Sequence, residues 1–172
     1  MTIRRFEPDD FPAIHEVINT AAEAYRGVIP GDCWKEPYMP EEELRHEIAS
    51  GIIFWCAGED WTITGVMGIQ SMNRTVALIR HAYVQPEWQQ QGIGSRLLAH
   101  LRQQTDLPFL VGTWADAAWA VRFYQKHGFQ LVSPQEKDRL LQLYWEIPER
   151  QRETSVVLAD QQWFDRQGTG QK

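Results

Sequence analysis

The chain has 172 residues, of which 43% are hydrophobic and 23% charged, and this composition is typical of a globular domain with a substantial core. Its formal net charge of −6 argues against nucleic acid or an anionic membrane as the main partner. Because the sequence lacks a long apolar run, an apolar N-terminal signal and more than two cysteines, it predicts a cytoplasmic protein without a transmembrane helix or a disulfide framework.

The first half of the chain alternates between helical and strand-like patterns. Apolar residues recur at spacings of three and four between residues 8 and 26, which predicts an amphipathic helix. The segments at residues 52–57 and 61–71 flank a Gly-Glu-Asp turn and should form a hairpin. We expect strands at residues 2–6, 52–57, 61–71 and 75–84, and helices at residues 8–26 and 40–51.

In the second half, strand-like and helical segments alternate regularly. We expect helices at residues 92–104, 116–127 and 134–145, strands at 108–113, 129–132 and 154–158, and a polar connector at 148–152. Hairpins followed by crossover helices predict a mixed α/β sheet with helices on both faces. Residues 1–160 should form a single domain, and residues 161–172 a partly disordered C-terminal tail.

The most informative stretch is the glycine-containing turn between the strand that ends at Val84 and the helix that follows. It reads Gln89-Gln90-Gln91-Gly92-Ile93-Gly94-Ser95. Unpaired backbone N–H groups at a helix start bind phosphate, and glycine lets a ligand approach the chain closely. The stretch therefore predicts a site for a pyrophosphate-bearing cofactor, with an ordinary strand-to-helix turn as the alternative if it is taken alone. The chain shows neither a complete dinucleotide fingerprint nor a Gly-Lys-Ser/Thr phosphate loop, and we expect no metal site.

A second motif occupies residues 120–129, Ala-Val-Arg-Phe-Tyr-Gln-Lys-His-Gly-Phe. Together with Val84-Gln85-Pro86 and the glycine turn, in this order and on these elements, it resembles the GCN5-related N-acetyltransferase (GNAT) superfamily. The resemblance extends from residue 2 to about residue 158. It implies a GNAT-like mixed, mostly antiparallel sheet of six to seven strands splayed in a V.

The resemblance also implies an activity, namely the direct transfer of an acetyl group from acetyl-CoA to an amine within a ternary complex. The pantetheine arm would lie along the strand edge near Val84, and Tyr124 would protonate the departing thiolate; a tyrosine packed in the core is the alternative for Tyr124. Backbone N–H groups of residues 90–95 would hold the pyrophosphate. The implied cofactor-binding residues are Val84, Gln89, Gln90, Gln91, Gly92, Ile93, Gly94 and Ser95.

Two positions depart from the pattern of the family. Many relatives have an asparagine at the position of Ala117 and a glutamate that acts as base at the position of Leu78. On the same strand, Arg80 cannot release its proton in a protein, whereas histidine is the side chain type suited to proton transfer at neutral pH, so His81 is the candidate base. Strict alternation would place Arg80 and His81 on opposite faces, but a bulge would change this. A structural histidine with a chain of waters as base is the alternative.

Several aromatic residues are candidates for binding the acceptor of the acetyl group. Trp34 and Tyr38 lie in a loop, and with Trp114 they are candidates for an acceptor pocket, although each could also be filler in the core or on the surface. Such a pocket favours a small-molecule amine. The alternatives are a protein N-terminus or lysine as acceptor, an acyl group other than acetyl, and a non-catalytic sensor or scaffold that binds acetyl-CoA. A homodimer is possible, and neither a nucleic acid nor a membrane is expected as a partner.

Overall fold

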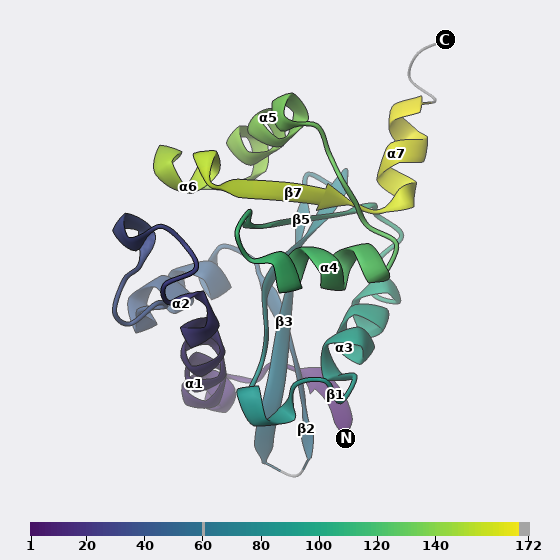
Figure 1. Ribbon diagram of the computed structural model, residues 1–172. Coiled ribbons are helices and arrows are strands. Elements are labelled where there is room, and N and C mark those ends of the chain that lie inside the picture. The colour runs from purple at the N-terminus through teal and green to yellow at the C-terminus, as the bar shows by residue number, and fades with distance from the viewer. Residues whose placement is uncertain (60, 169–172) are drawn as a thin grey trace. The chain divides into compact units, whose positions relative to one another are not determined.

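The computed structural model describes residues 1–59 and 61–168, which form seven strands, seven α-helices and four short 3-10 helices (Figure 1). The strands are β1 Thr2–Arg5, β2 Ile53–Glu59, β3 Thr62–Met72, β4 Val76–Val84, β5 Phe109–Trp114, β6 Gln130–Leu131 and β7 Ser155–Ala159. The α-helices are α1 Phe11–Ala22, α2 Glu41–Ala49, α3 Ile93–Arg102, α4 Ala118–Lys126, α5 Pro134–Tyr144, α6 Glu149–Glu153 and α7 Gln161–Gly168. The 3-10 helices are Pro8–Asp10, Glu23–Tyr25, Gly31–Cys33 and Pro86–Trp88.

The strands follow the order β1-β2-β3-β4-β5-β7-β6 in one seven-stranded sheet. The pairs β1–β2, β2–β3, β5–β7 and β6–β7 are antiparallel. This confirms the predicted mixed, mostly antiparallel sheet. In the part of the chain that the structure describes, no helix is both long and apolar enough to cross a membrane.

The chain divides into two compact units. Unit 1 comprises Met1–Arg26, Trp34–Gln70 and Ile79–Asp106, and unit 2 comprises Gly27–Cys33, Ser71–Leu78 and the chain from Leu107 onward. Strands β3 and β4 each pass from one unit into the other. The expected single domain over residues 1–160 stays a prediction.

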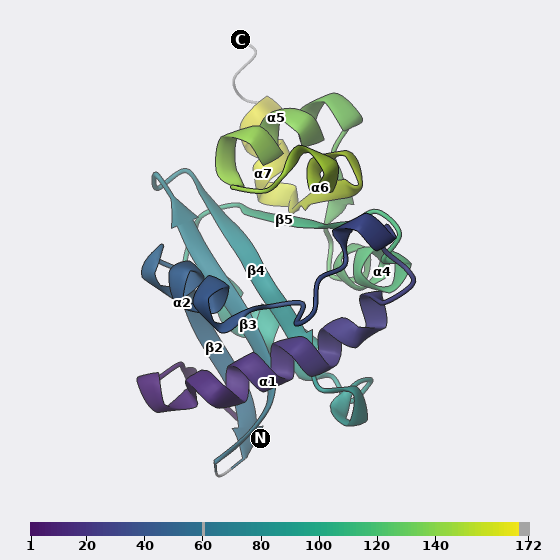
Figure 2. The same cartoon turned by 90° about the vertical axis from the view of Figure 1, so that its left-hand side faces the viewer.

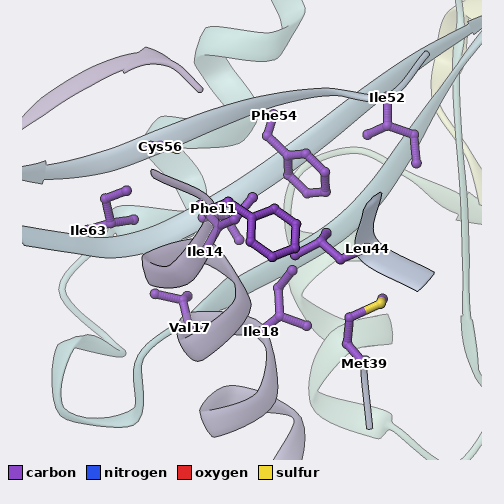
Figure 3. Packing of buried hydrophobic residues seen from close by; sticks show 11 residues of the cluster. Phe11, Ile14, Val17, Ile18, Met39, Leu44, Ile52, Phe54, Cys56 and Ile63 are labelled. Atoms are coloured by element: carbon purple, nitrogen blue, oxygen red, sulfur yellow. The ribbon is translucent and has the colours of Figure 1, made fainter. Parts of the chain in front are cut away.

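In unit 1, helices cover both faces of the strands. Figure 1 shows α1 and α2 on one side of β2 and β3 and α3 on the other, and in Figure 2 α1 and α2 lie in front of these strands. The stripe predicted for the first helix is confirmed, because Phe11, Ile14, Val17 and Ile18 are all buried. Figure 3 shows how this stripe meets Leu44 of α2 and the β2 side chains in one apolar cluster. Burial of this apolar surface fixes α1 and α2 on the sheet.

In unit 2, β5 and β7 pair in the register Leu110↔Ala159 and Gly112↔Val157. Leu140 and Leu141 of α5 pack with Leu110 and Val157, and Figure 1 shows α4 on the opposite side of β5 from α5. Each face of this part of the sheet is therefore covered by a helix, as the sequence predicted.

Two segments differ from expectation. The prediction of a polar connector at residues 148–152 is wrong, because Glu149–Glu153 form the helix α6. On this helix the guanidinium of Arg150 pairs with Asp32 at 2.8 Å. The C-terminal tail expected from residue 161 is helical through Gly168. Asp160 starts this helix, because its carboxylate accepts hydrogen bonds from the backbone N–H groups of Phe109 and Trp163, both at 3.0 Å. Trp163 is buried, and residues 169–172 lie outside the described residues.

The α2 contact can be tested with Leu44→Ala. Leu44 is fully buried, so the truncation removes apolar contacts and leaves a cavity that should lower the free energy of unfolding by about 3 kcal/mol. Urea denaturation followed by circular dichroism measures this change. Leu143→Ala on α5 is the control, because Leu143 is 55% exposed and its truncation should cost less than about 0.5 kcal/mol. Equal losses for the two variants would contradict the packing described for α2.

Candidate functional site

The turn between β4 and α3 is folded back on the end of the strand. After Val84 the chain makes the 3-10 helix Pro86–Trp88, and the side-chain amide of Gln89 then donates to the backbone oxygen of Val84 at 3.1 Å. Residues 89–92 are exposed, whereas the Ile93 side chain is buried and anchors the first turn of α3. The candidate loop is therefore held at both ends and open to solvent in between.

The backbone of this loop is left-handed at two residues just before α3. Gly92 is the N-cap residue with a φ of 80°, and Gln90 is also left-handed, with a φ of 61°. The first hydrogen bond of the helix runs from the Arg96 N–H to the Gly92 oxygen at 3.0 Å. The N–H groups of Ile93 and Gly94 precede it, and the first N–H groups of an α-helix have no carbonyl acceptor in their own helix.

The surroundings of these donors suit an anion. A Cβ atom built on Gly92 would meet nothing within 4 Å, so there is open space beside the turn. The first turn of α3 contains no acidic residue, and the positive end of the helix dipole lies there. Binding of a diphosphate at residues 90–95 stays a prediction.

Strand β4 carries a local irregularity three residues before it ends. His81 has a φ of 49°, a left-handed conformation that is uncommon for a residue with a side chain. Arg80 and His81 both approach the same carboxylate, that of Glu47 on α2, with Arg80 Nη2 at 2.8 Å and His81 Nε2 at 3.5 Å from Oε2. The strict alternation of faces considered from the sequence is thus broken at this point.

Glu47 is the polar residue that sequence reasoning did not select. Its side chain is only 17% exposed, and those of Arg80 and His81 are 13% and 15% exposed. Burial raises the pKa of Glu47, but the polar contact with His81 and the positive charge of Arg80 outweigh this effect and give a net lowered pKa. The carboxylate is therefore ionised at neutral pH. Arg80 is held further by the side-chain oxygen of Gln70 at 2.8 Å.

Aromatic residues gather elsewhere in unit 1. The ring of Tyr38 lies 5.6 Å from that of Trp34 and 5.5 Å from that of Tyr25, and the Tyr25 ring lies edge-on to Tyr83 at 6.3 Å. Burial, together with Tyr38 and Tyr25, raises the pKa of Tyr83, which therefore stays a neutral phenol. The guanidinium of Arg26 lies 4.6 Å above the Trp34 ring. The structure thus brings the rings of Trp34 and Tyr38 together. Tyr25 and Tyr83, which join them, were not among the residues selected from the sequence.

The other predicted site residues lie in unit 2. Trp114 ends β5 and is buried, and Tyr124 on α4 is buried with its ring edge-on to those of Phe123 and Phe129. The joint acceptor pocket of Trp34, Tyr38 and Trp114 stays a prediction, as does the acid role of Tyr124.

The two departures from the family pattern are accounted for by packing. Leu78 is fully buried in the apolar cluster of unit 2, and Ala117 is also fully buried. Neither position offers a group that can move a proton.

Comparison with protein families gives a match over residues 18–143 to a model described as an acetyltransferase (GNAT) domain. The chain belongs to the GNAT family. Comparison with curated proteins gives no match.

Solved GNAT structures share the fold. A GNAT-family acetyltransferase from Staphylococcus aureus Mu50 superposes with a TM-score of 0.70 at 16% identity and covers 92% of this chain and 97% of its own. The PaiA N-acetyltransferase from Thermoplasma acidophilum, in complex with coenzyme A, gives 0.67 at 19% identity over 92% and 97%. The ribosomal-protein-S18-alanine N-acetyltransferase from Escherichia coli gives 0.63 at 17% identity over 92% of each chain. At these identities the likeness shows the fold alone.

The loop assignment can be tested with Gly92→Leu. The new side chain would fill the open space beside the helix start, and any residue other than glycine is strained at this φ by about 1–2 kcal/mol. We expect the Kd for coenzyme A, measured by calorimetry, to rise at least about tenfold, which is roughly 1.4 kcal/mol.

Gly51→Leu is the matched control. Gly51 also has a positive φ, 98°, with nothing within 4 Å of a built Cβ, but it follows α2 rather than preceding α3. Both variants should lose similar stability, and only Gly92→Leu should lose affinity. An unchanged Kd in Gly92→Leu, or an equal rise in both, would count against the loop.

Proposed function

We propose that this protein is an acetyl-CoA-dependent N-acetyltransferase that transfers the acetyl group directly to the amine of a small molecule. The observation that carries the proposal is the start of α3, where a left-handed Gly92 precedes the N–H groups of Ile93 and Gly94, which have no carbonyl acceptor within the helix. Membership of the GNAT family and the coenzyme A complex of the PaiA relative support the same cofactor. Acetyl-CoA supplies the activated acetyl thioester.

The chain offers a binding element for each end of the cofactor. Backbone N–H groups of residues 90–95 would bind the pyrophosphate at the positive end of the α3 dipole. The edge of β4 near Val84 would bind the pantetheine arm by backbone hydrogen bonds, in the manner of an added strand. The Gln89 amide, which already holds the Val84 oxygen, would keep these two elements in register.

Two side chains would move protons. An amine is largely protonated at neutral pH, and His81 would accept its proton so that the nitrogen can attack. Tyr124 would donate its phenolic proton to the departing sulfur. Arg80 cannot replace His81, because a guanidinium keeps its proton and Arg80 is already paired with Glu47 and Gln70.

The acceptor side is best explained by the aromatic cluster of unit 1, formed by Tyr25, Trp34, Tyr38 and Tyr83. The rings of this cluster provide hydroxyl groups and apolar faces. They favour an amphiphilic amine with a flat apolar portion. The homodimer and the cytoplasmic location stay predictions.

An acceptor panel tests this function. The purified protein is incubated with acetyl-CoA and arylalkylamines, polyamines, amino acids, a lysine peptide or a peptide with a free N-terminus, and thiol release is followed. We expect release above background with small amines, most with those that carry a ring. Release only with the peptides would overturn the proposed acceptor class, and tight coenzyme A binding without release for any amine would indicate a sensor or scaffold.

The acid role is tested by Tyr124→Phe. The substitution removes one hydroxyl from a buried ring, and loss of a general acid should lower kcat about 100-fold with little change in the Kd for coenzyme A. Stopped-flow or steady-state thiol detection measures kcat. Tyr144→Phe on α5 serves as the control and should retain the wild-type rate. A Tyr124→Phe enzyme with unaltered kcat would remove Tyr124 from the mechanism.

A further inference from the structure

The carboxylate of Glu47 is shared between a permanent cation and an imidazole. Arg80 Nη2 and His81 Nε2 both face its Oε2 atom, at 2.8 and 3.5 Å. Building on the proposed acetyl transfer, we infer that Glu47 is a positioning residue. It orients the His81 ring through Nε2 and stabilises the positive charge that the ring acquires when it takes the proton of the acceptor amine.

The backbone of β4 is distorted in the way this role requires. A left-handed φ costs a residue with a side chain about 1–2 kcal/mol and persists only where its surroundings enforce it. Here the φ of 49° at His81 lets consecutive residues of one strand reach a single carboxylate. A regular strand would send one of the two side chains to the opposite face.

The His81 ring stacks on a neighbouring ring, but its Nε2 atom lacks a hydrogen bond of ordinary geometry. The ring stacks on Phe54 with the centroids 5.9 Å apart, which fixes its plane. Within residues 1–59 and 61–168, His81 Nε2 and Trp55 Nε1 are the buried side-chain nitrogens or oxygens without a hydrogen bond of ordinary geometry. A proton on Nε2 needs an acceptor, and Glu47 Oε2, 3.5 Å away, lies a few tenths of an ångström beyond the ordinary hydrogen-bond distance. Protonation of the ring would convert this contact into a shorter, charge-assisted hydrogen bond.

The charges around the ring explain why a carboxylate is needed. Arg80 and His81 from β4 and His46 from α2 itself act on Glu47, while Gln70 from β3 contributes a neutral amide to Arg80. An imidazolium formed next to a half-buried guanidinium would be repelled by it. Ionised Glu47 compensates this repulsion, much as the aspartate of a Ser-His-Asp triad stabilises its imidazolium.

The contact with Glu47 also implies a separate role for each of the two nitrogens of the His81 ring. With Nε2–H directed at Glu47, Nδ1 keeps its lone pair and is the atom that accepts the proton. The proton passes from the amine nitrogen to Nδ1, the ring becomes a cation, and the amine is left with a free electron pair. No electron transfer and no further reactant is involved.

The pairing can be measured in the free protein by nitrogen-15 NMR of labelled histidine, with His81 assigned through His81→Asn. In the wild type we expect the neutral ring to carry its proton on Nε2. In Glu47→Gln we expect the midpoint of His81 protonation to move to lower pH by at least about one unit, because a neighbouring negative charge is lost. A wild-type ring with its proton on Nδ1 would overturn the inference even if Glu47→Gln failed to fold.

Glu43→Gln is the control on the same helix. Glu43 pairs with Lys35, and both side chains are far more exposed than that of Glu47. This variant should leave the His81 midpoint where it is in the wild type. A Glu47→Gln protein that is folded and shows no shift relative to Glu43→Gln would also overturn the inference.

Activity provides the second readout. With an amine found in the panel, Glu47→Gln should lower kcat about tenfold with an unchanged KM for acetyl-CoA, and the acidic limb of its pH profile should move to lower pH together with the NMR midpoint. A purely structural role would lower stability without moving that limb. If acetyl transfer itself is wrong, the wild type will release no thiol with any amine, whereas failure of the Glu47 role leaves wild-type release intact.

Discussion

The backbone of β4 is constrained at two points, and the candidate chemistry of unit 1 depends on both. At His81 the chain adopts a left-handed conformation inside a strand, and after Val84 it leaves the sheet and turns into α3. The first point brings a titratable ring and a fixed cation to one carboxylate. The second starts α3 at a glycine that has open space beside it.

The polar trio of Glu47, Arg80 and His81 lies close to an apolar cluster, and this proximity determines its energetics. Phe54 belongs to that cluster and also stacks on His81, and Leu44 precedes Glu47 by one helical turn on α2. Withdrawal of three polar groups from water is costly unless each finds a partner. Arg80 bonds to both Glu47 and Gln70, whereas the contact of His81 Nε2 with Glu47 is 3.5 Å long. A buried nitrogen left in this state requires an explanation, and the role inferred for Glu47 provides one.

The features that could be predicted from the sequence are those that depend on residues close together in the chain. The stripe of α1 follows from spacing, and the turn at Gly92 follows from glycine chemistry, so both could be read without a structure. The contact of Glu47 with His81 joins positions 34 residues apart and depends on the left-handed φ of His81, for which the residue type provides no signal. The cluster of Tyr25, Tyr38 and Tyr83 is likewise a matter of tertiary packing. Helix α7 was missed because its start depends on Asp160, whose carboxylate binds the backbone of Phe109 on another strand.

The aromatic cluster of unit 1 carries a charged cover on one of its rings. The guanidinium of Arg26 covers one face of Trp34 and is itself held by Glu23 and Glu36, all at the exposed surface. An exposed indole thus has its cation–π partner within its own chain. Because the covering group belongs to a single side chain, truncation of Arg26 would open this ring face to solvent and leave Glu23 and Glu36 without the cation that they share.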